Sequence, residues 1–316
     1  MTHGPENANI GALQALSESV AATVGRIERS TVAVRGRRRH ALGSGVVWKP
    51  GVLVTAAHIF GRAPAAASIV TAPDGAIDVT LVGTDAPTDL AVFRLPGTEL
   101  PAASLAEAAD VRAGQLALLV GRSEEGEVTA SLTMVNRTSG AWQTWLGGRL
   151  DRLIRLDGGV HEGLSGSPVA NASGAVFGMA TSALSRSYGI VVPESTVSRV
   201  VEELLAKGHV ARAFLGVSAQ PVAVAGTPGQ VPGEGEVSSG LLITSLQPGG
   251  PAAQAGVLVG DIVVDVEQHR AQSLHDLRHS LADNIGKTVR VSLIRGGLPA
   301  QVSVTVGQWP TEARVC

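Results

Sequence analysis

Three short motifs that contain a histidine, an aspartate and a serine follow one another in the first half of this 316-residue chain. They are Thr55-Ala56-Ala57-His58, then Thr88-Asp89-Leu90-Ala91-Val92, and then Gly163-Leu164-Ser165-Gly166-Ser167-Pro168. A serine hydroxyl is a weak nucleophile at neutral pH and needs a neighbouring base to activate it. The motifs therefore predict a fold that brings His58, Asp89 and Ser165 together although they are far apart in the sequence.

The order of these residues along the chain indicates which fold that is. His-Asp-Ser is the order of chymotrypsin-type triads, whereas subtilisins have Asp-His-Ser and α/β-hydrolases have Ser-Asp-His. We therefore expect a double β-barrel on which Ser165 attacks a carbonyl, His58 takes and returns the proton, and Asp89 orients the imidazole. Backbone N–H groups of Gly163 and Ser165 are expected to form the oxyanion hole.

Each of these assignments has an alternative. Ser165 is also compatible with an ordinary turn serine beside Gly166, and a lone histidine is more often a packed or surface residue. Asp85 competes with Asp89 as the carboxylate, although Asp89 directly precedes an apolar, strand-like segment. His161 lies four residues before Ser165 and is a second candidate base, but we expect it on the wrong side of the turn.

The rest of the first 208 residues reads as short strands between turns, because the chain contains 39 glycines and 16 prolines. The number of expected strands suits two six-stranded barrels. The basic run Arg35–His40 is interpreted as a solvated hairpin tip rather than a phosphate site. The expected strands cover residues 31–34, 45–48, 51–55, 67–70, 78–82 and 89–95, and then 115–120, 128–135, 150–156, 167–169, 176–181 and 189–192.

Helical spacing of apolar residues predicts a helix over Ile10–Arg29 and a second over Thr196–Gly208, which ends at a glycine C-cap. A further domain of strands and short helices follows, with a loop over Pro221–Gly240 and a helix over Ser273–Ala282, for which Ser273 and Asp276 form a capping box. The expected organisation is a helical segment (1–30), a β-barrel domain (31–208), a second domain (211–308) and a tail (309–316).

The motifs and this second domain together resemble the HtrA family, trypsin-like serine proteases with a C-terminal PDZ domain. The resemblance extends over most of the chain and includes Gly43-Ser44-Gly45-Val46-Val47, the three motifs above, Phe214-Leu215-Gly216-Val217 and Gly260-Asp261-Ile262-Val263. It implies a mainly β fold, a chymotrypsin-like double β-barrel followed by a PDZ-like α+β domain. It also implies an endopeptidase that cleaves unfolded or exposed polypeptides in protein quality control. A homotrimer or a larger assembly is typical of the resemblance, but the N-terminal helix lacks the aromatic residues that often hold family trimers together, so the oligomeric state stays open.

The resemblance also indicates binding residues. It implies a specificity pocket lined by Val160, Thr181, Ala183 and Ile190, which contains no charge and should accept Val, Ala or Leu. In the PDZ-like domain, Phe214, Leu215, Gly216 and Val217 form the candidate loop for the carboxylate of a peptide C-terminus. Leu277 and Leu281 are one helical turn apart and either line the peptide groove or simply pack the core.

Two residues depart from the usual Gly-Asn-Ser-Gly-Gly-Pro motif of the family. Leu164 replaces the asparagine and Ser167 replaces the second glycine. Leu164 raises the question of what fixes the oxyanion loop, so a catalytically silent peptide-binding or chaperone protein of the same fold is the first alternative. A serine esterase on another fold is the second.

The remaining features argue against other classes of function. The net charge of −2 gives no reason to expect nucleic-acid binding, and no segment has the roughly 20 apolar residues of a membrane span. Cys316 is the only cysteine, so no intrachain disulfide is expected. His275 and His279 have metal-ligand spacing but lack a third ligand, and no metal or cofactor is expected. Without a signal-like segment the chain reads as cytoplasmic, with a periplasmic or extracytoplasmic setting as the alternative.

Overall fold

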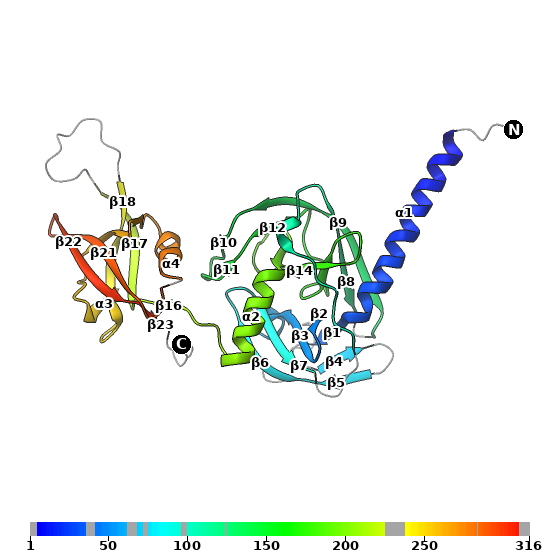
Figure 1. Ribbon diagram of the computed structural model, residues 1–316, viewed down its shortest axis with the longest axis horizontal. Coiled ribbons are helices and arrows are strands. Elements are labelled where there is room, and N and C mark those ends of the chain that lie inside the picture. Colours follow the sequence, from blue (N-terminus) through cyan, green and yellow to red (C-terminus); the bar gives the residue numbers. More distant parts are fainter. Residues whose placement is uncertain are drawn as a thin grey trace. The chain divides into compact units, whose positions relative to one another are not determined.

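The computed structural model describes residues 5–35, 42–61, 68–71, 75–95, 100–123, 125–224, 238–282 and 284–309. It divides into two compact units, Met1–Val210 and Ala211–Cys316 (Figure 1). Strands predominate in both units, and helices are few (Figure 1). The mainly β fold class expected from the sequence is therefore confirmed.

The first unit starts with helix α1 (Pro5–Ile27), which begins earlier than expected, and a 3-10 turn η1 (Glu28–Ser30) joins it to the first strand. Ile27, at the C-terminal end of α1, is buried in the core. Leu13 and Leu16, nearer the N-terminus, are 69% and 51% exposed. The apolar side of the helix is therefore covered mainly near its C-terminal end.

Seven strands form the first sheet, in the order β5-β4-β1-β2-β3-β7-β6. The sheet must curl until its two edges approach each other, because β5 and β6 lie at opposite ends of this order and only Val79 separates them in the chain. The expected single strand at 78–82 is wrong in this respect, since the chain forms two strands there. The strands are β1 (Thr31–Arg35), β2 (Leu42–Lys49), β3 (Val52–Ala56), β4 (Ser68–Thr71), β5 (Gly75–Asp78), β6 (Thr80–Asp85) and β7 (Leu90–Arg94).

The second sheet is a closed six-stranded barrel in the order β12-β15-β14-β13-β8-β9, as the sequence predicts. A small separate hairpin of β10 and β11 precedes β12, so the strand expected at 150–156 is interrupted. The elements are η3 (Ala108–Asp110), β8 (Leu116–Arg122), β9 (Val128–Ser139), β10 (Trp142–Gln143), β11 (Arg149–Leu150), β12 (Leu153–Leu156), β13 (Pro168–Ala170), β14 (Val176–Thr181) and β15 (Ile190–Pro193).

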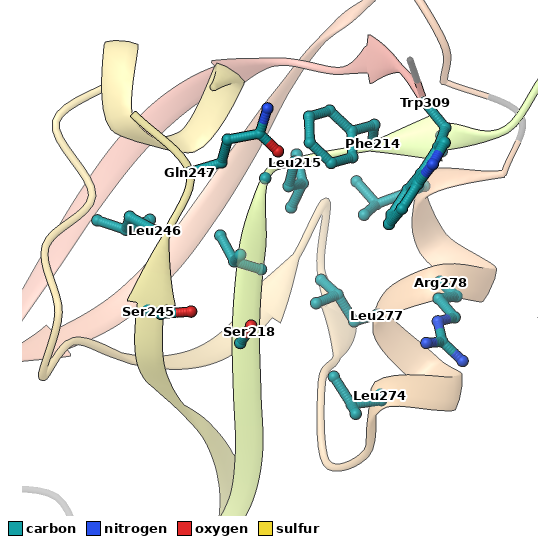
Figure 2. A pocket seen from close by; sticks show the side chains of 14 residues that line it. Phe214, Leu215, Ser218, Ser245, Leu246, Gln247, Leu274, Leu277, Arg278 and Trp309 are labelled. Carbon is teal, nitrogen blue, oxygen red and sulfur yellow. The ribbon is translucent and has the colours of Figure 1, made fainter. Parts of the chain in front are cut away.

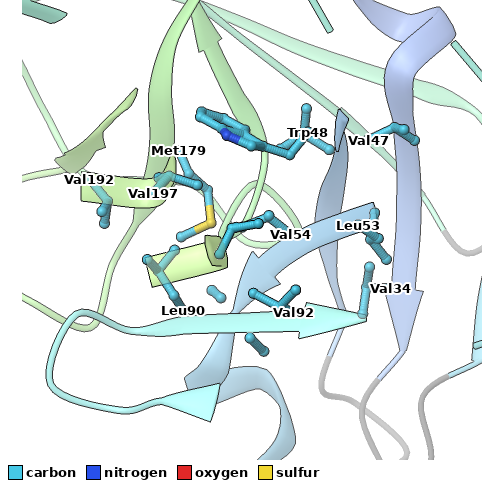
Figure 3. Close-up of a cluster of buried hydrophobic side chains, with 14 of the residues drawn as sticks. Val34, Val47, Trp48, Leu53, Val54, Leu90, Val92, Met179, Val192 and Val197 are labelled. Carbon is cyan, nitrogen blue, oxygen red and sulfur yellow. The ribbon is translucent and has the colours of Figure 1, made fainter. Parts of the chain in front are cut away.

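One apolar cluster contains side chains of both sheets (Figure 3). Val54 and Val92 come from the first sheet, whereas Met179 and Val192 come from the second barrel. Branched aliphatic side chains make up most of this core, in keeping with the low aromatic content of 3%. The two barrels are thus packed against each other, which fixes the position of any site between them.

Helix α2 (Glu194–Lys207) packs against both barrels and ends the first unit. Gly208 follows it with a φ of +72°, and its N–H donates to the carbonyl of Leu204 at 2.8 Å. A residue with no Cβ is suited to this left-handed C-terminal position. The expected helix and its glycine C-cap are therefore confirmed, with the start two residues earlier.

The second unit contains a sheet in the order β17-β18-β19-β21-β22, and β20 pairs with β19. β16 and β23 form a separate two-stranded pair. The expected capping box is present at α4, because the Ser273 side chain accepts from the Asp276 N–H while the Asp276 carboxylate accepts from the Ser273 N–H. The elements are β16 (Ala213–Phe214), β17 (Val217–Val224), β18 (Ser238–Leu246), α3 (Pro251–Gln254), β19 (Ile262–Val266), β20 (His269–Arg270), α4 (Leu274–Leu281), β21 (Thr288–Arg295), β22 (Leu298–Thr305) and β23 (Gly307–Gln308).

The loop expected over Pro221–Gly240 is too long at both ends. Residues 221–224 belong to β17, where Pro221 pairs with Leu241, and β18 already begins at Ser238. Proline is tolerated there because β17 is an edge strand of the sheet. Residues 225–237 lie outside the described residues, as do residues 36–40 of the basic run.

A buried carboxylate of the second unit has a fixed set of donors. The Arg295 guanidinium bonds Asp261 from Nε to Oδ1 at 2.9 Å and from Nη2 to Oδ2 at 2.7 Å. The backbone N–H of Leu258 donates to Oδ2 at 2.8 Å. These bonds, with the arginine as the largest cause, hold the pKa of Asp261 below its usual range.

We expect Asp261→Asn to lower the thermal midpoint of the second unit in the full chain by several degrees near neutral pH. A carboxyl with a lowered pKa stabilises the fold above its unfolded pKa of about 3.9, and this contribution is lost as the pH falls through the lower folded value. The difference between variant and wild type should therefore shrink when calorimetric melts are repeated below pH 4. An equal difference at every pH would contradict this account.

Candidate active site

The three candidate catalytic residues lie on turns that follow strands of two different sheets. His58 is in the 3-10 turn η2 (Ala57–Phe60) directly after β3, and Asp89 is in the tight turn between β6 and β7. Ser165 lies in the loop between β12 and β13 of the second barrel. β3 and β7 are neighbours in the first sheet, which explains why His58 and Asp89 meet.

Asp89 holds His58 through two hydrogen bonds. Its Oδ2 lies 2.7 Å from Nδ1 of the imidazole, and its Oδ1 accepts from the His58 backbone N–H at 2.8 Å. Asp89 is 3% exposed and has a φ of +58°, a left-handed conformation that aspartate tolerates better than most residues. The Ala57 N–H donates to the Asp89 carbonyl at 3.0 Å, which helps to hold this strained backbone.

The alternative carboxylate and base have other contacts. The Asp85 carboxylate accepts from the Thr88 hydroxyl at 2.6 Å, and the Asp85 carbonyl accepts from the Thr88 N–H, so Asp85 stabilises the turn that precedes Asp89. His161 is exposed, and its carbonyl accepts from the N–H of Leu164. The structure thus pairs the imidazole of His58 with Asp89.

Thr181 is a third group at this carboxylate, and the sequence reasoning did not foresee it. Its hydroxyl donates to Oδ2 of Asp89, and it accepts from the Ala183 N–H at 3.0 Å. The hydroxyl of Thr181 therefore helps to orient Asp89, and the place of Thr181 in the wall of the specificity pocket stays a prediction. Ile190 is buried, Val160 is half-buried and Ala183 is exposed, so their part in a pocket stays a prediction.

The hydroxyl of Ser165 contacts Ser182. Its Oγ lies 3.0 Å from Oγ of Ser182 and accepts from the Ser182 N–H at 3.3 Å. Within the described part of the chain, no hydrogen bond joins Ser165 Oγ to His58. The candidate nucleophile is thus bonded to Ser182 and the candidate base to Asp89, with no hydrogen bond between these two side chains in the described residues.

Ser44 of β2 fixes the loop around Ser165, a role that the sequence reasoning missed. Its N–H donates to the Ser165 carbonyl at 2.9 Å, and its hydroxyl donates to the Gly163 carbonyl at 2.7 Å. Gly166 has a φ of +87°, and a Cβ there would lie 2.1 Å from the Ser44 carbonyl oxygen. In the sequence, the motif Gly43-Ser44-Gly45 is recognisable only through the family resemblance.

The two departures from the family motif are both buried. Leu164 is 1% exposed and packs in the second barrel, so its side chain contributes apolar contacts instead of hydrogen bonds. The hydroxyl of Ser167 is buried without a hydrogen-bond partner in the described structure, which costs free energy. The loop is fixed by Ser44 and by backbone bonds such as Gly166 N–H to the Ala180 carbonyl at 2.8 Å.

A second candidate site is a groove of about 320 Å³ between β17 and α4 in the second unit (Figure 2). All six residues proposed for peptide binding line it: Phe214, Leu215, Gly216, Val217, Leu277 and Leu281. Leu277 and Leu281 also belong to the core of this unit, so both interpretations of them hold. Trp309 was not foreseen. Its ring meets that of Phe214 edge-on at 5.0 Å and lines the same groove (Figure 2).

The loop before β17 offers backbone donors to this groove. The N–H groups of Leu215 and Gly216 have no partner among the described residues, while their carbonyls accept from Ala252 and Gln247. Gly216 has a φ of +74°, which favours glycine at this turn. Two successive free N–H groups beside an apolar groove can bind a carboxylate.

No group of three or more His, Cys, Asp or Glu side chains among the described residues is arranged to hold a metal ion. No helix in the described ranges is both long and apolar enough to cross a membrane.

Protein-family models match residues 43–179 as a trypsin-like peptidase domain and residues 213–306 as a PDZ domain. The chain is 30% identical over 290 residues to a probable periplasmic serine endoprotease DegP-like of Halomonas elongata, which covers 86% of this chain and 57% of that protein. A protein of the same name from Rhizobium meliloti is 33% identical over 291 residues, with 88% and 55% covered. The chain thus spans about half the length of these relatives.

Solved structures share the fold. HtrA-type protease AlgW with decapeptide superposes with a TM-score of 0.74 at 22% identity, over 92% of this chain and 99% of that one. The serine endoprotease from Yersinia pestis has a TM-score of 0.71 at 24% identity, over 92% and 98%. The two domains in this order, the related sequences and the common fold show that the chain belongs to the HtrA family, in which a trypsin-like peptidase domain precedes a PDZ domain.

Proposed function

We propose that this chain is a serine endopeptidase that cleaves unfolded or exposed polypeptides and binds peptide C-termini at its PDZ domain. The observation that supports it most is the His58–Asp89 pair with bonds of 2.7 and 2.8 Å. Thr181 bonds Asp89, and its neighbour Ser182 contacts Ser165, so the three candidate groups are linked through consecutive residues. The relatives are named serine endoproteases, which agrees with this proposal.

In this proposal Ser165 Oγ attacks the scissile carbonyl while its proton passes to Nε2 of His58. In this mechanism the Asp89 carboxylate accepts a hydrogen bond from Nδ1–H of His58, so Nε2 is the free basic nitrogen. Asp89 also stabilises the imidazolium that forms. The N–H groups of Gly163 and Ser165 receive the negative charge on the carbonyl oxygen. His58 then returns its proton to the leaving amine, which completes acylation.

The proposal also covers the cellular compartment and the oligomeric state of the protein. Both relatives are named periplasmic, so we propose an extracytoplasmic setting, and the cytoplasmic expectation finds no support. A homotrimer, implied by the family resemblance, is proposed as the assembly. The exposed Leu13 and Leu16 of α1 are apolar side chains that an assembly could cover.

The sequence left two alternative functions, an esterase on another fold and a catalytically silent peptide-binding protein. A serine esterase on another fold is excluded, because the fold is that of a trypsin-like protease. A catalytically silent peptide-binding protein remains an outcome of the tests below, since Ser165 Oγ is bonded to Ser182.

Removal of the triad groups should abolish hydrolysis of unfolded casein. We expect Ser165→Ala and Asp89→Asn each to lower the turnover number by about 10⁴-fold or more, because the nucleophile or the correct imidazole tautomer is lost. Asparagine also tolerates the left-handed backbone at position 89. Asp85→Asn is the matched carboxylate variant, and it should stay active if its thermal melt remains cooperative. Equal hydrolysis by wild type and Ser165→Ala would contradict the proposal.

The predicted specificity pocket can be tested with peptides that differ only in the residue before the scissile bond. We expect Val, Ala or Leu there to give a kcat/KM at least about tenfold above that for Lys or Arg. No charged residue is assigned to the pocket, so a buried cation would stay unpaired. Fast cleavage after Lys or Arg, with none after Val or Leu, would overturn the pocket assignment.

The PDZ groove should discriminate between a free C-terminal carboxylate and an amide. We expect an apolar-ended peptide to bind at least about tenfold more tightly than its C-terminally amidated form, because the N–H groups of Leu215 and Gly216 bond an ionised acceptor. Fluorescence anisotropy of labelled peptides on the full chain measures this ratio. Equal affinities would mean that the loop does not bind the carboxylate.

A further inference from the structure

The hydroxyl of Ser165 is bonded to Ser182 and not to His58 in the described residues. Ser165 is 7% exposed, and both Oγ and the N–H of Ser182 lie within hydrogen-bond distance of its Oγ, at 3.0 and 3.3 Å. The imidazole of His58 is bonded through Nδ1 to Asp89 and has no bond to Ser165 in the described residues. Either hydroxyl can be the donor in the Oγ–Oγ bond, and where Ser165 donates to Ser182 its single proton cannot also be donated to His58.

We propose that Ser182 is a positioning residue, which holds the Ser165 hydroxyl in an orientation in which it is not bonded to His58. This inference rests on the proposed peptidase function. Ser165 must leave the contact with Ser182, by rotation between staggered side-chain positions, before His58 can accept its proton. Ser182 therefore lowers the fraction of molecules in which the nucleophile is activated.

The position of Ser182 at the end of β14 suits this role. Thr181, the last residue of β14, bonds Asp89, and the next residue bonds Ser165. Consecutive residues thus act on the carboxylate and on the nucleophile. Thr181 is fully buried, whereas Ser182 is exposed just beyond the strand, where its side chain is free to move aside.

The rate of reaction with a fluorophosphonate measures the activated fraction directly. Ser165 Oγ forms a bond to phosphorus, fluoride leaves with the bonding electron pair, and the hydroxyl proton passes to His58. Ser182→Ala removes the Oγ–Oγ bond but keeps the N–H. A neutral hydrogen bond of ordinary net strength corresponds to about a fivefold change, or about 1 kcal/mol.

We expect Ser182→Ala to react about fivefold faster than wild type and to raise kcat for casein by a similar factor with little change in KM. Ser182→Thr keeps the hydroxyl and should react at the wild-type rate. Ser187→Ala is the control, because Ser187 lies on the same loop and its hydroxyl has no hydrogen bond in the described residues. The midpoint of the pH–rate profile should not move, since the His58–Asp89 contact is untouched.

An unchanged or slower Ser182→Ala, or a rise in Ser182→Thr as well, would overturn the role of Ser182 and leave the peptidase proposal standing if wild type is active. A shifted pH midpoint would also overturn it, because it would mean that the base had changed. If neither wild type nor Ser182→Ala reacts, both proposals fail. A silent wild type that becomes reactive in Ser182→Ala supports the inference.

Discussion

The hydrogen bonds from Ser44 to the Gly163–Ser165 loop join the first sheet to the second barrel where the candidate active site forms. Ser44 is on β2, and its N–H and hydroxyl both donate to loop carbonyls, at 2.9 and 2.7 Å. Gly166 allows the approach, because a Cβ atom there would collide with the Ser44 carbonyl. Together with the packing of the two barrels, this attachment holds the serine of one barrel in position relative to the histidine of the other.

The buried carboxylate of Asp89 organises the base in the same way. A buried carboxyl group needs hydrogen-bond partners, and here the His58 N–H, the imidazole and the Thr181 hydroxyl provide them. These donors come from both sheets. The imidazole is therefore oriented by both barrels together, and small movements between them would change its geometry.

The groove of the second unit depends on an apolar core and one edge strand. Its apolar core is covered by α3, α4 and a strongly paired sheet, while the edge strand β17 leaves one side of the groove open. The free N–H groups of Leu215 and Gly216 lie at the end of this groove. An edge strand beside an apolar groove is the arrangement in which an extended peptide adds to a sheet.

Local patterns in the sequence were enough for much of the fold. Alternating apolar residues between turns gave most strands, and Gly208 and the Ser273–Asp276 pair marked helix ends because caps depend on nearby residues. The division of residues 75–85 into β5 and β6 was missed, as was the strand character of residues 221–224. Both depend on which neighbour a segment pairs with, and propensity does not contain this information.

The sequence by itself determined the identity of the candidate triad and of the peptide groove, because the chemistry needs particular residue types and these stand in recognisable motifs. Only the tertiary structure decided that Thr181 bonds Asp89, that Ser44 holds the nucleophile loop, that Trp309 reaches the groove, and that Ser165 faces Ser182. These are contacts between residues far apart in the chain, or choices among side-chain orientations. Both are fixed by packing, which no local pattern of residues specifies.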